Sequence, residues 1–107
     1  MTALLLILVG TVTAPAAEPP RAPQTVTVED RPNDAGTGLK VTWELSPDDT
    51  PDQQPRKVLE YHVYREVDGE RAAEPVAVMP AGNTQFDDGD CSSKSAYRYF
   101  VQAVGPD

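Results

Sequence analysis

Six segments of this chain alternate apolar and polar residues with a period of two, which is the pattern of β-strands that have one buried face. Turn-forming residues separate these segments, and none of the intervening stretches has the period of an amphipathic helix. The pattern therefore predicts an all-β fold of antiparallel sheets packed face to face. The predicted strands cover residues 24–30, 39–45, 59–67, 74–79, 84–87 and 96–104.

Alternation also predicts which side chains face the core. In the second predicted strand every other residue is apolar, so these side chains should all point inward. They are Leu39, Val41, Trp43 and Leu45. The third predicted strand should divide its side chains between the two faces. Its inward set is Leu59, Tyr61 and Val63, and its outward set is Glu60, His62 and Tyr64.

Turn and edge signals refine this picture. The pair Asp68-Gly69 predicts a tight turn after the third strand, and Pro75 restricts the fourth strand to the edge of a sheet. Two acidic stretches, residues 46–57 and 87–90, are interpreted as solvent-exposed turns. The second stretch carries oxygen ligands that calcium prefers, but it lacks the spaced carboxylates and closing glutamate of a helix-loop-helix calcium site. We therefore predict no metal site there.

The N-terminus predicts export. Residues 1–17 are uncharged and contain an apolar run at 3–9 followed by small residues, as in a secretory signal peptide cleaved near Ala16 or Ala17. No positive charge precedes the run, so the alternative is a segment retained as a membrane anchor. A proline-rich linker would follow at 18–23, and the folded domain would cover 24–107. The expected location is secreted, periplasmic or on the cell surface.

Composition and charge narrow the range of functions. A chain of 107 residues has room for one domain with one modest core. Its formal charge of -8 disfavours nucleic acid as a partner, and also membrane contact other than through a retained anchor. His62 and Cys91 are the only histidine and cysteine, and no glycine-framed nucleophile turn is present. We therefore predict a protein that is not an enzyme and has no cofactor, and Cys91 has no partner for a disulfide within the chain.

Fragments in a fixed order give the chain a family resemblance over residues 23–104. They are Pro23-x-x-Val26-x-Val28, Leu39-x-Val41-x-Trp43, Tyr61-His62-Val63-Tyr64-Arg65, Thr84-Gln85-Phe86-Asp87 and Tyr97-x-Tyr99-x-Val101-x-Ala103-Val104. Together they resemble a fibronectin type III domain in the form common among bacterial members. The resemblance implies an immunoglobulin-like antiparallel β-sandwich with six of its seven strands present.

The resemblance also implies roles for individual residues. Tyr97 would occupy the tyrosine corner, where the ring packs inside and the hydroxyl bonds to a backbone group across a loop. The implied structural core is Trp43, Tyr61, Val63, Tyr97, Tyr99 and Val101. The chain departs from the family in its long loop at 46–57 and in its missing last strand. We expect either that the protein continues past Asp107 or that a partner supplies the strand.

One group of exposed aromatic side chains is a candidate interaction patch. If Tyr61 and Tyr99 face inward, alternation turns His62, Tyr64 and Phe100 outward on neighbouring strands. Aromatic faces of this kind anchor protein partners or stack on sugars. The alternative is that the side chains of Arg65 and Arg98, or the missing region of the domain, cover the patch.

The sequence leaves three functions open. The first is a non-catalytic extracytoplasmic spacer or protein-interaction module at the N-terminus of a larger exported or membrane-anchored protein, with proteins or neighbouring domains as partners. The second is a carbohydrate-binding accessory domain of a secreted hydrolase, which the aromatic patch would serve. The third is the sensor domain of an envelope enzyme.

Overall fold

A computed structural model describes residues 19–30, 38–92 and 94–106 of the chain. The segment interpreted as a signal peptide lies outside these residues. Within them the fold is all-β, with seven strands and no helix, and therefore with no helix long and apolar enough to cross a membrane. The strands are β1 (Gln24–Asp30), β2 (Leu39–Glu44), β3 (Glu60–Val67), β4 (Glu70–Arg71), β5 (Ala77–Pro80), β6 (Gln85–Asp88) and β7 (Tyr97–Val104).

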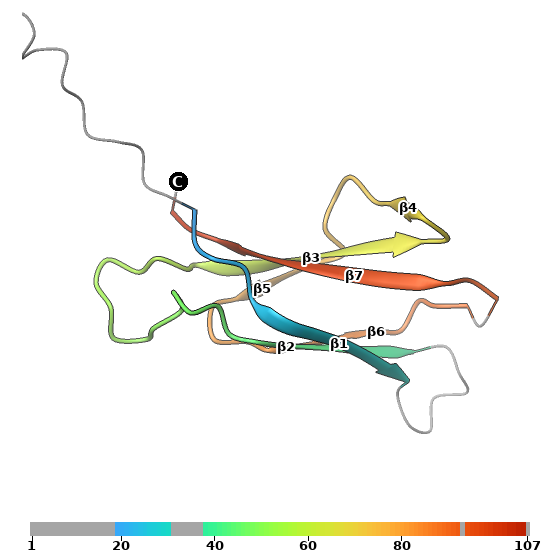
Figure 1. Ribbon diagram of the computed structural model, residues 1–107, viewed down its shortest axis with the longest axis horizontal. Helices are drawn as coiled ribbons and strands as arrows, with labels where there is room; N and C mark the ends of the chain where they lie inside the picture. Colours follow the sequence, from blue (N-terminus) through green and yellow to red (C-terminus); the bar gives the residue numbers. More distant parts are fainter. Residues whose placement is uncertain (1–18, 31–37, 93, 107) are drawn as a thin grey trace, which may run out of the picture.

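The strands form two antiparallel sheets that lie one above the other (Figure 1). The first sheet has the order β1-β2-β6. In the second sheet β3 is central, pairing with β4 and β5 on one side and with β7 on the other. The ladder between β3 and β7 is the longest, running without a register shift from Glu60 opposite Val104 to Val67 opposite Tyr97. The described residues thus form a β-sandwich.

The core lies between the two sheets because both contribute buried side chains to it. The first sheet provides Val41 and Trp43 from β2, and the second provides residues of β3 and β7. The rings of Trp43 and Tyr61 lie 5.8 Å apart across the core. The buried hydrophobic residues are Val41, Trp43, Val58, Tyr61, Val63, Tyr99, Val101 and Ala103, and Tyr97 packs against them in a half-buried position.

The inward positions predicted at the ends of β2 and β3 are wrong at two leucines. Leu45 is 37% exposed because β2 ends at Glu44, and the amide of Ser46 then bonds to the hydroxyl of Tyr61. Leu59 is 47% exposed because β3 begins only at Glu60, while Val58 is fully buried in its place. The alternation therefore does not extend beyond the ladder.

Other boundaries also differ from the prediction. β5 and β6 begin and end later than expected, and β4 was missed because two residues are too few to show alternation. The turn before β4 is as predicted, with positive φ at both Asp68 (49°) and Gly69 (88°), the geometry of a two-residue type I′ hairpin. β5 lies at the margin of its sheet, and Pro75 precedes the strand.

Residues 19–23 lie against the domain. Pro23 is buried, and the guanidinium of Arg21 binds the carboxylate of Asp48 at 2.8 Å. This hydrogen-bonded contact holds the pKa of Asp48 at about 2. The described part of the proline-rich segment is thus fastened to the loop between β2 and β3.

Val58 occupies the core position that was predicted for Leu59, so truncating each of these two residues tests the register of the chain before β3. We expect Val58→Ala to lower the free energy of unfolding by about 2 kcal/mol, because two buried methyl groups are lost and a cavity remains. Leu59→Ala should cost well under about 1 kcal/mol because that side chain is half exposed. Urea unfolding of both variants measures the difference. A larger loss for Leu59→Ala than for Val58→Ala would support the register predicted from the sequence instead.

Candidate functional site

The aromatic residues predicted to face outward lie on the outer surface of the second sheet. Tyr64 on β3 is directly opposite Phe100 on β7, and His62 is opposite Gln102. The rings of His62 and Tyr64 lie 6.5 Å apart, and His62 contacts the carboxylate of Glu60. All three predicted patch residues are partly exposed, so the ladder brings them together on one face.

Two arginines cover the middle of this patch. The guanidinium of Arg71 lies 4.2 Å from the ring centroid of Phe100 and 5.3 Å from that of Tyr64. The guanidinium of Arg98 lies 5.4 Å from the centroid of Phe100. Both arrangements place a cation within range of the negative face of a ring. We call Tyr64, Arg71, Arg98 and Phe100 the arginine-capped face.

The local charge of the arginine-capped face differs from that of the chain as a whole. Arg98 pairs with Glu66 at 3.7 Å, but no ion pair among the described residues includes Arg71. The face thus carries the cations of Arg71 and Arg98 above the aromatic rings, with Glu66 directly opposite Arg71 in the ladder, although the net charge of the chain is -8. In physiological salt the interaction between exposed charges is largely screened beyond about 8 Å. The attraction of a charged ligand to this face would therefore depend mainly on the charges of the face itself.

The expectation that Arg65 covers the patch is wrong. Arg65 shares the inner face of β3 with Tyr61 and Val63, and its guanidinium bonds to Asp88 at 3.0 Å. Arg71 was not predicted to lie on this face, although a signal was present. With Asp68 and Gly69 as the two turn residues, Val67 pairs with Glu70 and Glu66 pairs with Arg71. Paired residues share a face, and Glu66 shares its face with Tyr64 two positions earlier, so Arg71 lies on that face too.

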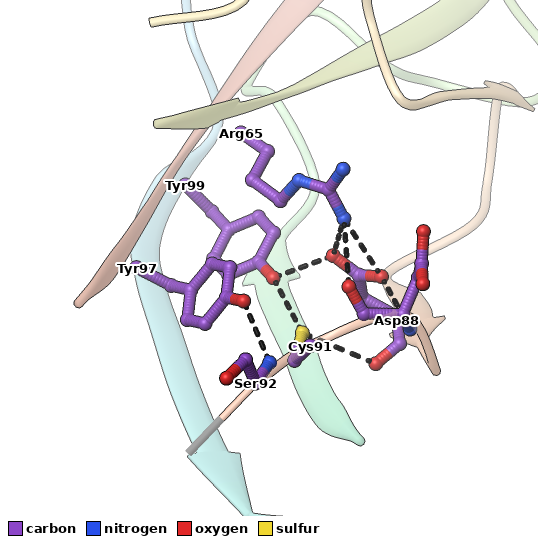
Figure 2. A network of polar contacts seen from close by, with 7 residues as sticks. Arg65, Asp88, Cys91, Ser92, Tyr97 and Tyr99 are labelled. Carbon is purple, nitrogen blue, oxygen red and sulfur yellow. Dashed lines mark hydrogen bonds and ion pairs between the residues drawn. The ribbon is translucent and has the colours of Figure 1, made fainter. Parts of the chain in front are cut away.

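A buried polar network lies at the end of the sandwich near β6 (Figure 2). The hydroxyl of Tyr99 donates to the carboxylate of Asp88 at 2.6 Å, and Arg65 donates to both carboxylate oxygens at 3.0 and 3.2 Å. The amide of Asp90 donates to the same carboxylate at 3.1 Å. Asp88 is 4% exposed, so these donors replace the water that it lost on burial.

The electrostatics of this network follow from burial and hydrogen bonding. Burial works to raise the pKa of Asp88, but the hydrogen bonds from Tyr99, the Asp90 amide and Arg65 outweigh it and hold the pKa below its ordinary value. Burial, together with donation to Asp88, raises the pKa of Tyr99. Burial also raises the pKa of the Cys91 thiol, whose sulfur lies 3.5 Å from the Tyr99 hydroxyl. The thiol is therefore not activated as a nucleophile.

A second network of the same type lies near the β2–β3 loop. The hydroxyl of Tyr61 donates to Asp49 at 2.7 Å and accepts the amide of Ser46 at 3.0 Å. Arg56 and the amide of Gly82 also donate to Asp49. Burial is the main cause that raises the pKa of Tyr61. In both networks a buried carboxylate accepts hydrogen bonds from a core tyrosine and from an arginine. In the second network the Nε of Arg56 is buried without a hydrogen-bond partner among the described residues.

The prediction that both acidic stretches are solvent-exposed is wrong at their key residues. Asp49 is 6% exposed and Asp88 is 4% exposed. Asp88 follows Phe86 by two positions in β6, so alternation from the apolar Phe86 was a signal that it faces inward. For Asp49 the only indirect signal was Tyr61, since a buried tyrosine hydroxyl requires a hydrogen-bond partner.

Within the part of the chain that the structure describes, no three histidine, cysteine, aspartate or glutamate residues are placed to hold a metal ion. No protein-family model matches this chain, and a search of curated proteins finds no significant match.

Titration of Asp88 can be tested through stability. Its pKa in the folded chain lies below the ordinary value of 3.8, so its stabilising effect is present above pH 3.8 and is lost as pH falls through the folded-state pKa. At pH 7 we expect Asp88→Asn to lower the free energy of unfolding by about 1–3 kcal/mol. This deficit should shrink between pH 5 and pH 2, as measured by denaturant unfolding at each pH.

Asp87→Asn is the matched control for Asp88→Asn, because it removes the same charge at an exposed neighbouring position. It should change stability by less than about 0.5 kcal/mol at every pH. A deficit for Asp88→Asn that is independent of pH would contradict the role of the ionised carboxylate.

The hydroxyl of Tyr97 gives a further test. It accepts the backbone amide of Ser92 at 2.7 Å across the loop between β6 and β7. We expect Tyr97→Phe to lower the free energy of unfolding by about 1 kcal/mol, because the amide loses this partner. Tyr64→Phe is the control, since no hydrogen bond of its hydroxyl occurs within the described ranges, and it should be near neutral. Equal melting midpoints for Tyr97→Phe and wild type would contradict a structural role of the hydroxyl.

Proposed function

We propose that this chain is a non-catalytic, exported β-sandwich module of the fibronectin type III class that contacts an acidic segment of a protein partner or neighbouring domain. The observation that carries the proposal is the arginine-capped face, where Arg71 and Arg98 lie over the ring of Phe100. Arginine and aromatic residues are enriched among the side chains that dominate binding energy at protein interfaces.

Two observations support the class of module. β1, β2 and β6 form one sheet and β3, β5 and β7 form most of the other, so the described residues have the β-sandwich architecture that the family resemblance implies. The uncharged apolar segment at 1–17 supports export. As a module at the N-terminus of a larger exported or membrane-anchored protein, the sandwich would hold neighbouring domains apart and offer its second sheet as a contact surface.

The position of the arginines favours a protein partner over a carbohydrate. A sugar ring stacks on an open aromatic face, whereas Phe100 already has a guanidinium 4.2 Å from its centroid. An acidic side chain, in contrast, forms charge-assisted hydrogen bonds with a guanidinium fork without displacing it from the ring.

NMR titration of the isotope-labelled full chain tests the proposed function. The probes are a hexaglutamate peptide and two neutral glycans, cellohexaose and chitohexaose. We expect the peptide to shift the amide signals of Tyr64, Arg71 and Phe100, and the glycans to shift none of them. Arg71→Gln should weaken the response to peptide severalfold, because it removes the cation that has no ion-pair partner among the described residues.

Lys94→Gln is the matched control for Arg71→Gln, since it removes one exposed positive charge away from the arginine-capped face. It should leave the response unchanged. Shifts caused by a glycan and not by the peptide would replace the proposal with the carbohydrate-binding alternative. Absence of shifts with every probe would refute binding at this face and leave spacing as the function.

A further inference from the structure

Glu66 lies between the two arginines of the arginine-capped face. In the ladder of β3 with β4 it is directly opposite Arg71, and in the ladder of β3 with β7 it is directly opposite Arg98. Residues that are directly opposite each other share a face of the sheet, so the three charged side chains form a row across the outer surface of the second sheet. Because β3 is the central strand, both neighbours of Glu66 in this row belong to strands that the structure describes.

The two pairs in this row differ in geometry. The amide of Ala72 donates to the carbonyl of Arg65 at 3.0 Å, which makes these two residues a hydrogen-bonded pair. Pairs alternate along an antiparallel ladder, so Glu66 and Arg71 form a non-hydrogen-bonded pair, the kind whose side chains lie closer together. On the other side, the carboxylate of Glu66 lies 3.7 Å from the guanidinium of Arg98. Glu66 therefore has a cation on each side.

Glu66 is also partly buried on this face. Arg71 begins on β4 and reaches Phe100 on β7, so its side chain crosses β3, the strand of Glu66. The side chain of Glu66 is only 15% exposed, whereas that of Arg98 is 72% exposed. Partly buried charges are screened much less than exposed ones, so the carboxylate of Glu66 acts strongly on any charge that binds at this face.

We propose that Glu66 determines the specificity of the arginine-capped face, as an internal counterion that lowers the affinity for anions and favours a single carboxylate over a phosphate monoester. Two guanidinium groups and one carboxylate leave the row with a single positive charge, which one carboxylate side chain of a partner neutralises. The inference rests on the proposed function, because it names the anionic group that an acidic partner presents to this face.

The preference follows from how the repulsion depends on the charge of the ligand. The Coulomb energy between Glu66 and a bound anion is proportional to the charge of that anion. A phosphate monoester has a second pKa of about 6, so above neutral pH it carries nearly twice the charge of a carboxylate. The repulsion energy from Glu66 is then about twice as large for the phosphate, and the factor by which Glu66 weakens binding is squared.

NMR titration of the isotope-labelled full chain in low salt at about pH 7.5 tests the proposal. The probes are the peptide acetyl-Gly-Ser-Glu-Ser-Gly-amide and the same peptide with phosphoserine in place of glutamate. The signals followed are the amides of Tyr64, Arg71 and Phe100. The wild type should bind the glutamate peptide at least as tightly as the phosphoserine peptide. Glu66→Gln should bind the glutamate peptide about threefold more tightly and the phosphoserine peptide about ninefold more tightly.

Glu70→Gln is the matched control for Glu66→Gln. It removes the same charge next to Arg71, but Glu70 is opposite Val67 and therefore faces the other side of the sheet. It should change the affinity for either peptide by less than about 1.5-fold. Glutamine has nearly the shape of glutamate, and the amide signals of β1 and β2 verify that Glu66→Gln retains the fold. The order of the two wild-type affinities tests the proposal independently of any variant.

Failure of this inference and failure of the proposed function give different results. If neither the glutamate peptide nor hexaglutamate shifts the signals of the wild type, the proposed function is refuted together with the inference. If the glutamate peptide binds wild type and Glu66→Gln equally, the proposed function stands and Glu66 has no role in specificity. Equal gains for both peptides in Glu66→Gln, or a wild type that prefers phosphoserine, would also overturn the inference alone.

Discussion

The carboxylate of Asp88 joins the two sheets at one end of the sandwich, and the buried hydroxyl of Tyr99 and the guanidinium of Arg65 depend on it for their hydrogen bonds. Asp88 belongs to β6 in the first sheet, while its donors Tyr99 and Arg65 belong to β7 and β3 in the second. The chain has a single cysteine, so no disulfide within it links the sheets. Such a buried carboxylate stabilises only while all its donors are present, because an unpaired buried charge is costly. The network therefore determines the relative position of the two sheets as well as the stability of their contact.

The architecture could be predicted from the sequence because alternation is a local signal. The inward positions of Val41, Trp43 and Val63 follow from their own strands, without knowledge of any distant contact. The failures at Leu45 and Leu59 have one physical reason, which is that both residues lie just outside a ladder. There the amide of Leu59 donates to the carbonyl of Val104 at the end of β7, and the amide of Ser46 donates to the Tyr61 hydroxyl, so the period of two no longer holds.

The candidate site was predicted only in part because its main interactions connect distant residues. Tyr64 and Phe100 could be placed on one face from the strand pattern, but the guanidinium over them comes from Arg71, beyond a tight turn. The roles of Asp49 and Asp88 depend on partners 12 and 11 positions away, Tyr61 and Tyr99. Aspartate in a segment that contains glycine or proline is usually an exposed turn residue, and only the folded chain shows which aspartates are buried.

The arginine-capped face depends on the hairpin between β3 and β4. Asp68 and Gly69 form a turn that places Arg71 over Phe100, and Asp68 also accepts the amide of Ala96 at the start of β7. Neither turn residue belongs to the arginine-capped face. Insertion of one residue in this turn would shift Arg71 to the other face of the sheet and leave every ring in place. The length of one turn therefore decides whether the outer face of the second sheet carries this guanidinium, although the turn itself contributes no side chain to that face.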